Sequence, residues 1–351
     1  MEPSIIFPNL GITLGYFPTG FKIFGFTINF YGVVIALGII VAVAIAVAIA
    51  KKTNQDPDDY FDIAITLIVC GVIGARIYYI IFSPEEFPTF ISMLNIRNGG
   101  LAIYGGLIGG IIGIAVCCKI KKIKLLRVLD TCAFVVPLAQ AIGRWGNFFN
   151  REAFGKYTDG LFAMQIKMSE ASGVITDEMR EKIVNINGVD YIQVTPTFLY
   201  ECIWCLLVFV LIMAFRRYQK YDGEVLLWYA GGYGLGRAWI EGLRTDSLYI
   251  GHSNIAVSQL LSIALVAAAL TLLIINRVRL AKGLWKPEFS VVLPDGAPGT
   301  KAFNKAKKDA RKAKKEDKWE TYEVGKKEEP AQENKEEWVD LEEDDTQEKG
   351  E

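Results

Sequence analysis

Apolar segments of about 20 residues recur along this chain and restrict what it can fold into. A helix needs about 20 mostly apolar residues to cross the hydrocarbon core of a bilayer. Segments of that kind lie at 30–50, 61–82, 101–118, 128–149, 197–215, 224–241 and 255–276. The pattern excludes a single water-soluble domain and predicts an all-α membrane protein with seven transmembrane helices.

The short loops between these segments differ in basic content, and basic loops remain on the cytoplasmic side. Loop 119–127 carries five Lys/Arg and loop 216–223 carries three, whereas loops 83–100 and 242–254 carry one each. The N-terminus is therefore predicted outside the cell membrane and the C-terminus in the cytoplasm.

This orientation divides the chain into five predicted parts. An exterior N-terminal segment, 1–29, precedes transmembrane helices 1–4 at 30–149; an exterior head insertion, 150–196, precedes transmembrane helices 5–7 at 197–285; and a charged cytoplasmic tail occupies 286–351. Residues 301–318 have a net charge of +6 and residues 319–351 a net charge of −10. So few apolar residues cannot form a core, and the tail is expected to be mostly disordered.

Composition excludes several classes of function. His252 is the single histidine, so a site with two histidine ligands is impossible, and the six cysteines all fall in apolar segments. We expect neither a metal nor a cofactor. The membrane body has almost equal numbers of basic and acidic residues, which argues against nucleic-acid binding.

Glycine spacing in the third predicted span indicates how that helix packs. Gly105, Gly109 and Gly113 recur every four residues and form one small-residue face, which is typical of close helix–helix contact in membranes.

Polar residues gather at the predicted outer ends of the spans. A charged group inside a membrane has a high free-energy cost, so it is usually functional, paired with an opposite charge or hydrated. The fourth span carries Gln140, Arg144, Asn147 and Asn150 in its outer half, and the sixth carries Tyr229, Tyr233, Arg237 and Glu241 at four-residue spacing. Asp62, Asp130 and Glu224, at the inner ends, are expected to be ordinary interfacial charges.

This distribution predicts a polar cavity that opens to the outer leaflet. Arg76, Arg144, Arg237 and Arg244 are candidates to hold an anion, because the planar guanidinium suits phosphate, and a phospholipid headgroup is the anion available at that depth. Structural pairing, such as Arg237 with Glu241, is the alternative for individual residues. A membrane transporter or a lipid-binding protein with an outer-leaflet anion site stays open as an alternative function.

One segment closely resembles a family signature. Residues 143–155, GRWGNFFNREAFG, match every fixed position of G-R-x-G-N-F-x-N-x-E-x-x-G, the signature of the prolipoprotein diacylglyceryl transferases. Further resemblance lies in Phe30-Tyr31-Gly32, in residues 98–107, in residues 195–201, and in Tyr233 through Arg237, Glu241, Arg244 and Asp246, and it covers roughly residues 1–285.

The resemblance implies the first step of bacterial lipoprotein maturation in the cell membrane. A diacylglyceryl group moves from phosphatidylglycerol to the lipobox cysteine thiol of a preprolipoprotein, a thioether forms, and glycerol 1-phosphate leaves. Phosphatidylglycerol, lipobox peptides and the bilayer are thus the expected partners.

We expect Arg144 and Arg237 to stabilise the departing phosphate, because charge grows on it in the transition state. Asn147, Asn150, Gln140 and Arg244 would surround the headgroup, Tyr31 and Tyr233 would line its cavity, Glu241 would orient Arg237, and Glu152 would tie the exterior loop to the site. Many family members have a candidate base, histidine, where Tyr104 stands. A phenol titrates at about pH 10 and an imidazole at about pH 6.5, so Tyr104 is not a like-for-like replacement, but it is one candidate to accept the thiol proton. His252, solvent and the departing phosphate remain alternatives for the proton.

Overall fold

The computed structural model describes residues 2–84, 89–95, 99–249 and 255–285. They belong to one compact unit, Met1–Pro294. The predicted tail and His252 lie outside the described residues.

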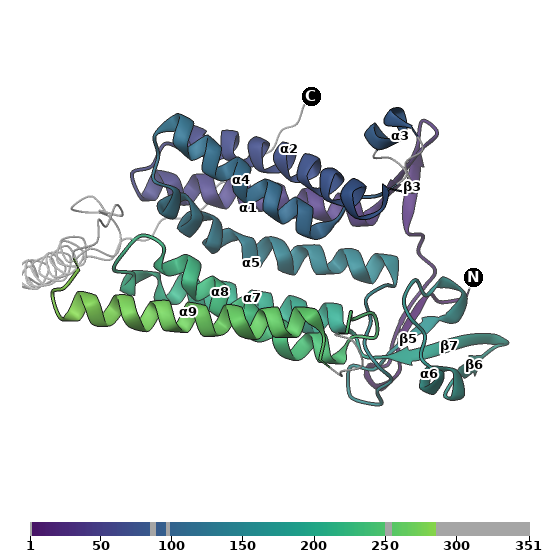
Figure 1. The fold of residues 1–351 in the computed structure, drawn as a ribbon. Coiled ribbons are helices and arrows are strands. Elements are labelled where there is room, and N and C mark those ends of the chain that lie inside the picture. The colour runs from purple at the N-terminus through teal and green to yellow at the C-terminus, as the bar shows by residue number, and fades with distance from the viewer. Residues whose placement is uncertain (1, 85–88, 96–98, 250–254, 286–351) are drawn as a thin grey trace, which may run out of the picture. The chain divides into compact units, whose positions relative to one another are not determined.

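Long helices form the body, as predicted (Figure 1). Within the described ranges they are α1 (Phe30–Lys52), α2 (Pro57–Phe82), α4 (Ile103–Lys121), α5 (Leu125–Asn150), α7 (Thr197–Phe215), α8 (Glu224–Ile240) and α9 (Val257–Ala281). Two short helices, α3 (Phe90–Leu94) and α6 (Asp177–Glu181), lie between them in the sequence.

Six of these helices are long and apolar enough to cross a membrane. The exception is α8, which spans 17 residues and continues into a 3₁₀ turn at Glu241–Leu243. The structure therefore supports a multi-pass membrane protein with six clear spans. The predicted sixth span, 224–241, is helical, but it is short and carries charged residues at both ends.

Local sequence explains where helices begin. The Asp56 side chain accepts a hydrogen bond from the Asp58 amide at 3.0 Å, and Pro57 occupies the first turn of α2. Both features favour a helix start. The helix consequently begins at Pro57, four residues before the predicted boundary.

The predicted glycine face of α4 packs against α2. A Cβ added at Gly109 would lie 3.0 Å from the Gly74 Cα, and one at Gly113 would lie 2.7 Å from the Cys70 Cβ. Side chains larger than hydrogen would force the two helices apart, so the prediction of a packing face is confirmed.

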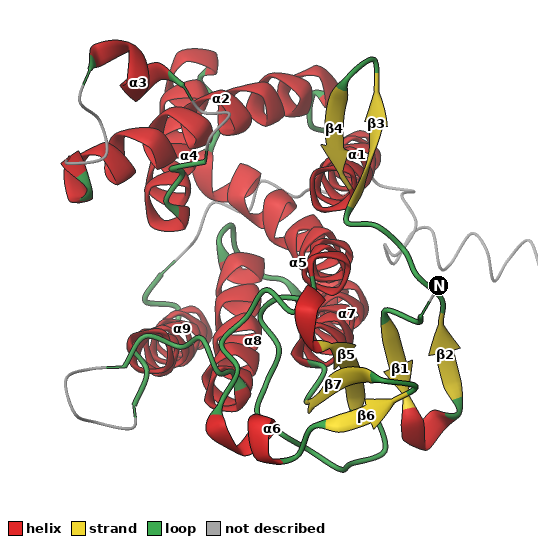
Figure 2. Cartoon of the chain, turned by 90° about the vertical axis from the view of Figure 1, so that its right-hand side faces the viewer, coloured by secondary structure: helices red, strands yellow, loops and turns green. Residues whose placement is uncertain are grey.

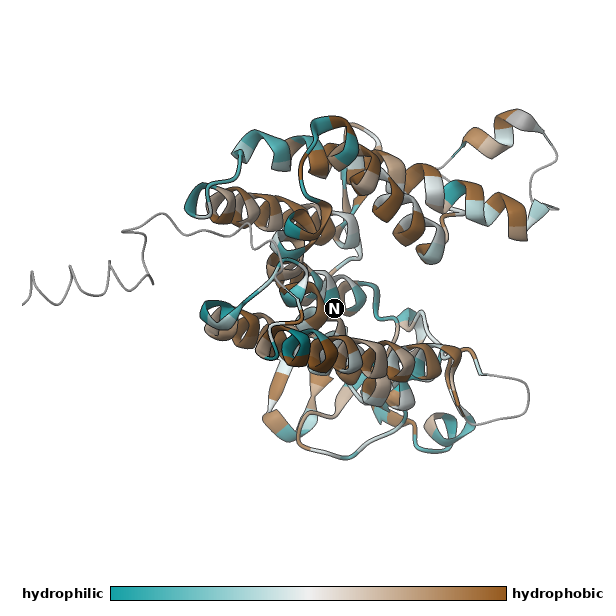
Figure 3. Ribbon diagram, turned by 60° about the vertical axis from the view of Figure 1, so that its left-hand side comes forward, coloured by the Kyte–Doolittle hydropathy of each residue, from teal (hydrophilic) through white to brown (hydrophobic). Residues whose placement is uncertain are grey.

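The end-on view in Figure 2 shows α5 at the centre of the bundle, with α1 on one side of it and α7 on the other. The helix surfaces are predominantly apolar, and hydrophilic residues concentrate in turns and at helix ends (Figure 3). This distribution is typical of a membrane body.

An antiparallel five-stranded sheet lies beside one end of the bundle (Figure 2). Its order is β2-β1-β5-β7-β6, with β1 at Ile5–Phe7, β2 at Ile12–Leu14, β5 at Met164–Lys167, β6 at Val184–Ile186 and β7 at Val189–Val194. A separate hairpin joins β3 (Gly20–Ile23) to β4 (Phe26–Asn29).

The sheet joins two segments that are distant in sequence. Ile5 pairs with Leu14 on one side and with Ile166 on the other, and Gln165 pairs with Gln193. Ile5, Ile166 and Ile192 are fully buried in the core beneath it. The all-α prediction is thus corrected: the protein is mostly helical but has two small sheets, whose three- to six-residue strands are too short to give a clear alternating pattern.

Candidate active site

Three chain segments cross at the end of the bundle beside the sheet, which we call the head end. Gly155 N donates to Thr195 O, Lys156 N donates to Leu243 O, and Thr195 N donates to Lys156 O, each at 2.9 Å. A Cβ at Gly155 would lie 2.7 Å from Leu243 O, so only glycine fits this crossing. The crossing fixes the end of α5, the start of α7 and the end of α8 beside one another.

Glu201, in the second turn of α7, lies at the centre of a cluster of arginines close to this crossing. Its Oε2 accepts from Arg144 Nε at 2.5 Å, and its Oε1 lies 2.9 Å from Arg237 Nη1 and 3.5 Å from Arg244 Nη1. The Glu201 side chain is only 7% exposed. One buried carboxylate from α7 therefore holds arginines from α5, from α8 and from the segment after α8.

The second carboxylate of the cluster is Glu241, which pairs with Arg237 as predicted. Its Oε2 lies 2.5 Å from Arg237 Nη2. The Ser247 hydroxyl donates to the Glu241 carboxylate and to its backbone carbonyl, both at 3.0 Å. Arg237 is consequently held between two buried carboxylates, Glu201 and Glu241.

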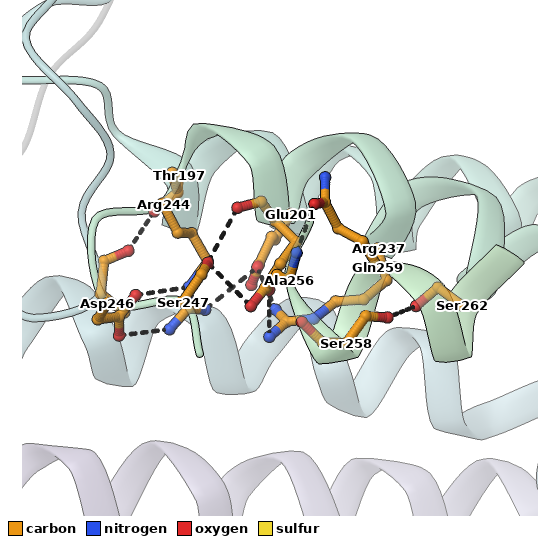
Figure 4. Close-up of polar contacts among 12 residues, drawn as sticks. Thr197, Glu201, Arg237, Arg244, Asp246, Ser247, Ala256, Ser258, Gln259 and Ser262 are labelled. Atoms are coloured by element: carbon orange, nitrogen blue, oxygen red, sulfur yellow. Dashed lines mark hydrogen bonds and ion pairs between the residues drawn. The ribbon is translucent and has the colours of Figure 1, made fainter. Parts of the chain in front are cut away.

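Arg244 forms a two-point ion pair with Asp246. Nε donates to Oδ1 at 2.9 Å and Nη2 donates to Oδ2 at 2.7 Å (Figure 4). Burial alone would raise the pKa of Asp246, but the hydrogen bonds from Arg244 hold that pKa below its ordinary value. The pair therefore stays charged at neutral pH, and its stabilising effect is lost only as the pH falls through the lowered pKa.

A polar chain links Arg144 to the segment after α5. Arg144 Nη1 donates to Asn147 Oδ1 at 3.4 Å, and Asn147 Nδ2 donates to Glu152 Oε1 at 2.9 Å. The predicted connection of Glu152 to the site is thus present as a hydrogen bond. It links the first residues after α5 to the guanidinium of Arg144.

Arg144 and Arg237 keep donors for a further partner. Arg144 Nη2 and Arg237 Nε have no partner among the described residues, and their side chains are 23% and 20% exposed. Both arginines line a small pocket, together with Trp204, Cys205, Tyr233 and Ile240. Arginines with spare donors beside a partly open pocket can bind a phosphate.

The other predicted site residues lie at different distances from this pocket. Tyr233 lines it directly and stacks on Tyr229, with 5.8 Å between ring centroids. Gln140 is partly buried, and its side-chain carbonyl oxygen meets no hydrogen-bond donor among the described residues. Tyr31 packs against Gly146, where a Cβ would lie 2.7 Å from its ring. Asn150 is the last residue of α5 and is partly buried.

Tyr104 is not joined to the cluster. It lies in the first turn of α4 with half of its surface exposed, and it makes no hydrogen bond or ion pair with the described part of the chain. Its assignment to the site therefore rests on the sequence motif.

The prediction that Arg76 holds an anion is wrong. Its Nε donates to Met93 O at 2.7 Å, and its two terminal nitrogens donate to four more backbone carbonyls at 2.8–2.9 Å, those of Ser92, Asn95, Gly99 and Gly100. All five donors thus fix the segment between α2 and α4. The sequence could not reveal this, because the partners are main-chain atoms.

Two acidic residues at the opposite end of the bundle also differ from expectation. Asp130 and Glu224 are buried rather than interfacial. The Asp130 carboxylate accepts from Gly223 N at 2.7 Å and from Leu226 N at 2.8 Å, and Glu224 pairs with Arg277 at 2.5 Å. They fix the turn before α8, which is a structural role.

Sequence reasoning missed the central part of Glu201 and the contribution of Trp204. Glu201 was visible as an acid within an apolar helix, in the motif at residues 195–201. Trp204 Nε1 donates to Gly232 O at 2.9 Å, and its ring occupies the space above Gly236, where a Cβ would collide with the indole. The glycines of α8 were the sequence feature that could have indicated a large side chain packed against that helix.

Comparison with known proteins gives one consistent result. The family model described as prolipoprotein diacylglyceryl transferase matches residues 18–275. A Clostridium perfringens protein named phosphatidylglycerol–prolipoprotein diacylglyceryl transferase 1 is 41% identical over 248 residues, which cover 70% of this chain and 89% of that protein. Two further relatives are named phosphatidylglycerol–prolipoprotein diacylglyceryl transferase. The one from Finegoldia magna is 39% identical, and the match covers 75% of this chain and 96% of that protein. The one from Enterococcus faecalis is 41% identical, and the match covers 73% of this chain and 89% of that protein.

Proposed function

The chain belongs to the prolipoprotein diacylglyceryl transferase family, and we infer from this membership that it is a membrane transferase that moves a diacylglyceryl group from phosphatidylglycerol to prolipoproteins. The inference rests on the extent of the family match, residues 18–275, which includes α5 with Arg144 and α8 with Arg237. The site contributes an independent argument, because two arginines with spare donors suit a phospholipid phosphate.

We propose that the acceptor is the thiol of a lipobox cysteine. Its sulfur attacks the glycerol carbon that is bonded to the phosphate oxygen, a carbon–sulfur bond forms, and that carbon–oxygen bond breaks. The electron pair leaves with the phosphate ester as glycerol 1-phosphate, and the thiol proton passes to a base. The products are a thioether-linked diacylglyceryl prolipoprotein and glycerol 1-phosphate.

The head end is proposed to face the exterior, with the pocket at the level of the outer leaflet. The basic turns at the opposite end support this placement, because such turns remain in the cytoplasm. The N-terminus would be outside and the C-terminus inside, with the sheet as the core of the exterior head.

Arg144 and Arg237 are proposed to bind the phosphate through the donors that Glu201 and Glu241 leave free. Negative charge on the leaving oxygen grows as the carbon–oxygen bond breaks, so fixed guanidinium groups stabilise the transition state more than the ground state. Asn147, supported by Glu152, would contact the headgroup together with Asn150. Arg244 would position the cluster through Glu201, and Gln140, Tyr31 and Tyr233 would complete the lining.

Tyr104 is proposed, on its motif position, as the group that accepts the thiol proton. Tyr104→Phe should lower kcat at least about tenfold and leave KM for phosphatidylglycerol nearly unchanged, because a general base contributes to the chemical step rather than to lipid binding. The pH dependence of kcat is the deciding measurement. Full activity with an unchanged pH profile would show that solvent or the departing phosphate takes the proton.

The charged tail is proposed to be dispensable for chemistry, since the cluster lies within residues 144–247. A chain that ends at residue 300 should transfer the diacylglyceryl group at a rate within about twofold of the full chain, the size of effect expected for a change far from the reacting atoms. A stably inserted truncation without activity would give the tail a role in the reaction.

The function itself is tested with purified protein in phosphatidylglycerol vesicles and a synthetic lipobox peptide. Mass spectrometry should detect a peptide that has gained one diacylglyceryl group, and the same peptide with serine in place of cysteine should remain unmodified. Lipid movement across the vesicle membrane without a modified peptide would instead favour a transporter.

A further inference from the structure

A polar pocket lies at the end of the bundle opposite the arginine cluster. The turn between α1 and α2 and the turn between α4 and α5 border a partly open pocket of about 450 Å³. Lys122, Lys124 and Arg127 line it on one side, and Asp56 and Asp59 line it on the other. None of these residues has a part in the proposed transfer reaction.

The two carboxylates of this pocket are already engaged. Asp59 lies 2.8 Å from Lys121, which also pairs with Asp62 at 2.5 Å. Asp56 accepts from the Asp58 amide as the cap of α2. The three lining cations outnumber these two carboxylates, so the lining of the pocket carries a net charge of +1.

Arg127 is held in a fixed orientation in the pocket. Its Nη2 donates to Thr53 O at 2.5 Å and to Asn54 O at 3.3 Å. Its Nη1 makes no hydrogen bond in the part of the chain that the structure describes, and its Nε is buried without an acceptor there. An immobilised guanidinium with donors to spare binds an anion with little further loss of side-chain entropy.

The floor of the pocket is polar and internally satisfied. The Tyr60 hydroxyl donates to Gln55 Oε1 at 2.6 Å, and Gln55 Nε2 donates to Thr53 Oγ1 at 2.8 Å and to Thr131 Oγ1 at 3.2 Å. A ligand would accordingly interact with the cations on the wall and would not compete for the groups of the floor.

The pocket lies where the apolar segments end. α1 ends at Lys52 and α2 begins at Pro57, while α4 ends at Lys121 and α5 begins at Leu125. In a membrane this is the depth of the lipid phosphates, and basic pockets between helices on the cytoplasmic side suit anionic headgroups. This step rests on the membrane placement proposed above.

We propose that this pocket binds a phosphate anion, carried by a phospholipid headgroup of the cytoplasmic leaflet or free in solution. Occupation would connect the α1–α2 turn to the α4–α5 turn through Lys122 and Arg127. The bound anion would thereby stabilise these two turns against each other, at a site separate from the one where the lipid reacts.

The test measures binding to the full chain apart from activity. Dihexanoyl phosphatidic acid and inorganic phosphate are titrated in separate arms, and the shift in the thermal unfolding midpoint is recorded for the wild type, Lys122→Gln, Arg127→Gln and the matched control Lys119→Gln. Lys119 carries the same charge at the end of α4 but does not line the pocket. Loss of one charge-assisted contact should weaken binding about tenfold in the two pocket variants and leave the control unchanged.

A shift with the lipid alone identifies a headgroup site, and an equal shift with phosphate identifies a free-anion site. Equal midpoint shifts in the wild type and in both pocket variants would overturn the proposal. If Arg127→Gln fails to fold, the Lys122→Gln variant alone tests the proposal. The Lys122 side chain is exposed, so its replacement should not disturb folding. Transfer activity of Lys122→Gln should equal that of the wild type, so failure here is distinguishable from failure of the proposed reaction.

Discussion

Glu201→Ala should reduce transfer to the detection limit, because one buried carboxylate holds Arg144, Arg237 and Arg244. Removing it leaves three guanidinium groups facing one another, and breaking a buried ion pair costs about 3–5 kcal/mol of stability. Glu201→Gln keeps the volume and one acceptor oxygen but removes the charge. We expect it to fold and to lose about 100- to 1000-fold in kcat/KM, the range found when one preorganised electrostatic group is lost.

The matched control for this prediction is Glu224→Gln. Glu224 is also fully buried and pairs with an arginine, but it lies at the opposite end of the bundle. Both variants should lower the unfolding midpoint, whereas only the Glu201 variant should lose activity per folded molecule. Equal activity in the two variants would contradict a central role for Glu201.

Arg144→Ala and Arg237→Ala should each lower kcat about 100- to 1000-fold, with a smaller change in KM, because the phosphate carries more charge in the transition state than in bound lipid. Lysine at either position should restore little activity, since an ammonium cannot contact a carboxylate and a phosphate with the same planar geometry. Single-turnover rates at saturating phosphatidylglycerol measure this loss directly.

Arg217→Ala provides the control for general loss of charge. Arg217 lies in the 3₁₀ turn after α7, away from the head end, and is exposed. Its replacement should leave the transfer rate unchanged. A rate in the Arg144 or Arg237 variants that equals the Arg217 variant would remove both arginines from the reaction.

Helical periodicity was the most reliable part of the sequence prediction. The pairing of Arg237 with Glu241 follows from four-residue spacing on one helix, and the repeated glycines of α4 predict a packing face, although not that α2 lies against it. Both predictions depend on the spacing of residues along one helix, which the sequence contains directly.

Contacts between segments that are far apart in the sequence could not be predicted from it. Nothing local indicates that Glu201 meets arginines from α5, from α8 and from the segment after α8, or that the first strand pairs with residues 164–167. Arg76 and Arg144 also look alike in sequence, since each is an arginine in an apolar helix. Only the fold shows that main-chain carbonyls occupy all the donors of Arg76, whereas Arg144 keeps a donor at the pocket.

The proposed phosphate site is tested most directly by the binding of glycerol 1-phosphate, the expected product. Its phosphorus resonance should broaden on addition of purified protein, and the compound should inhibit transfer competitively with phosphatidylglycerol. The double variant Arg144→Ala, Arg237→Ala should lose this binding, while Arg217→Ala should retain it. Undiminished binding of glycerol 1-phosphate by the double variant would contradict the assignment of these arginines to the lipid phosphate.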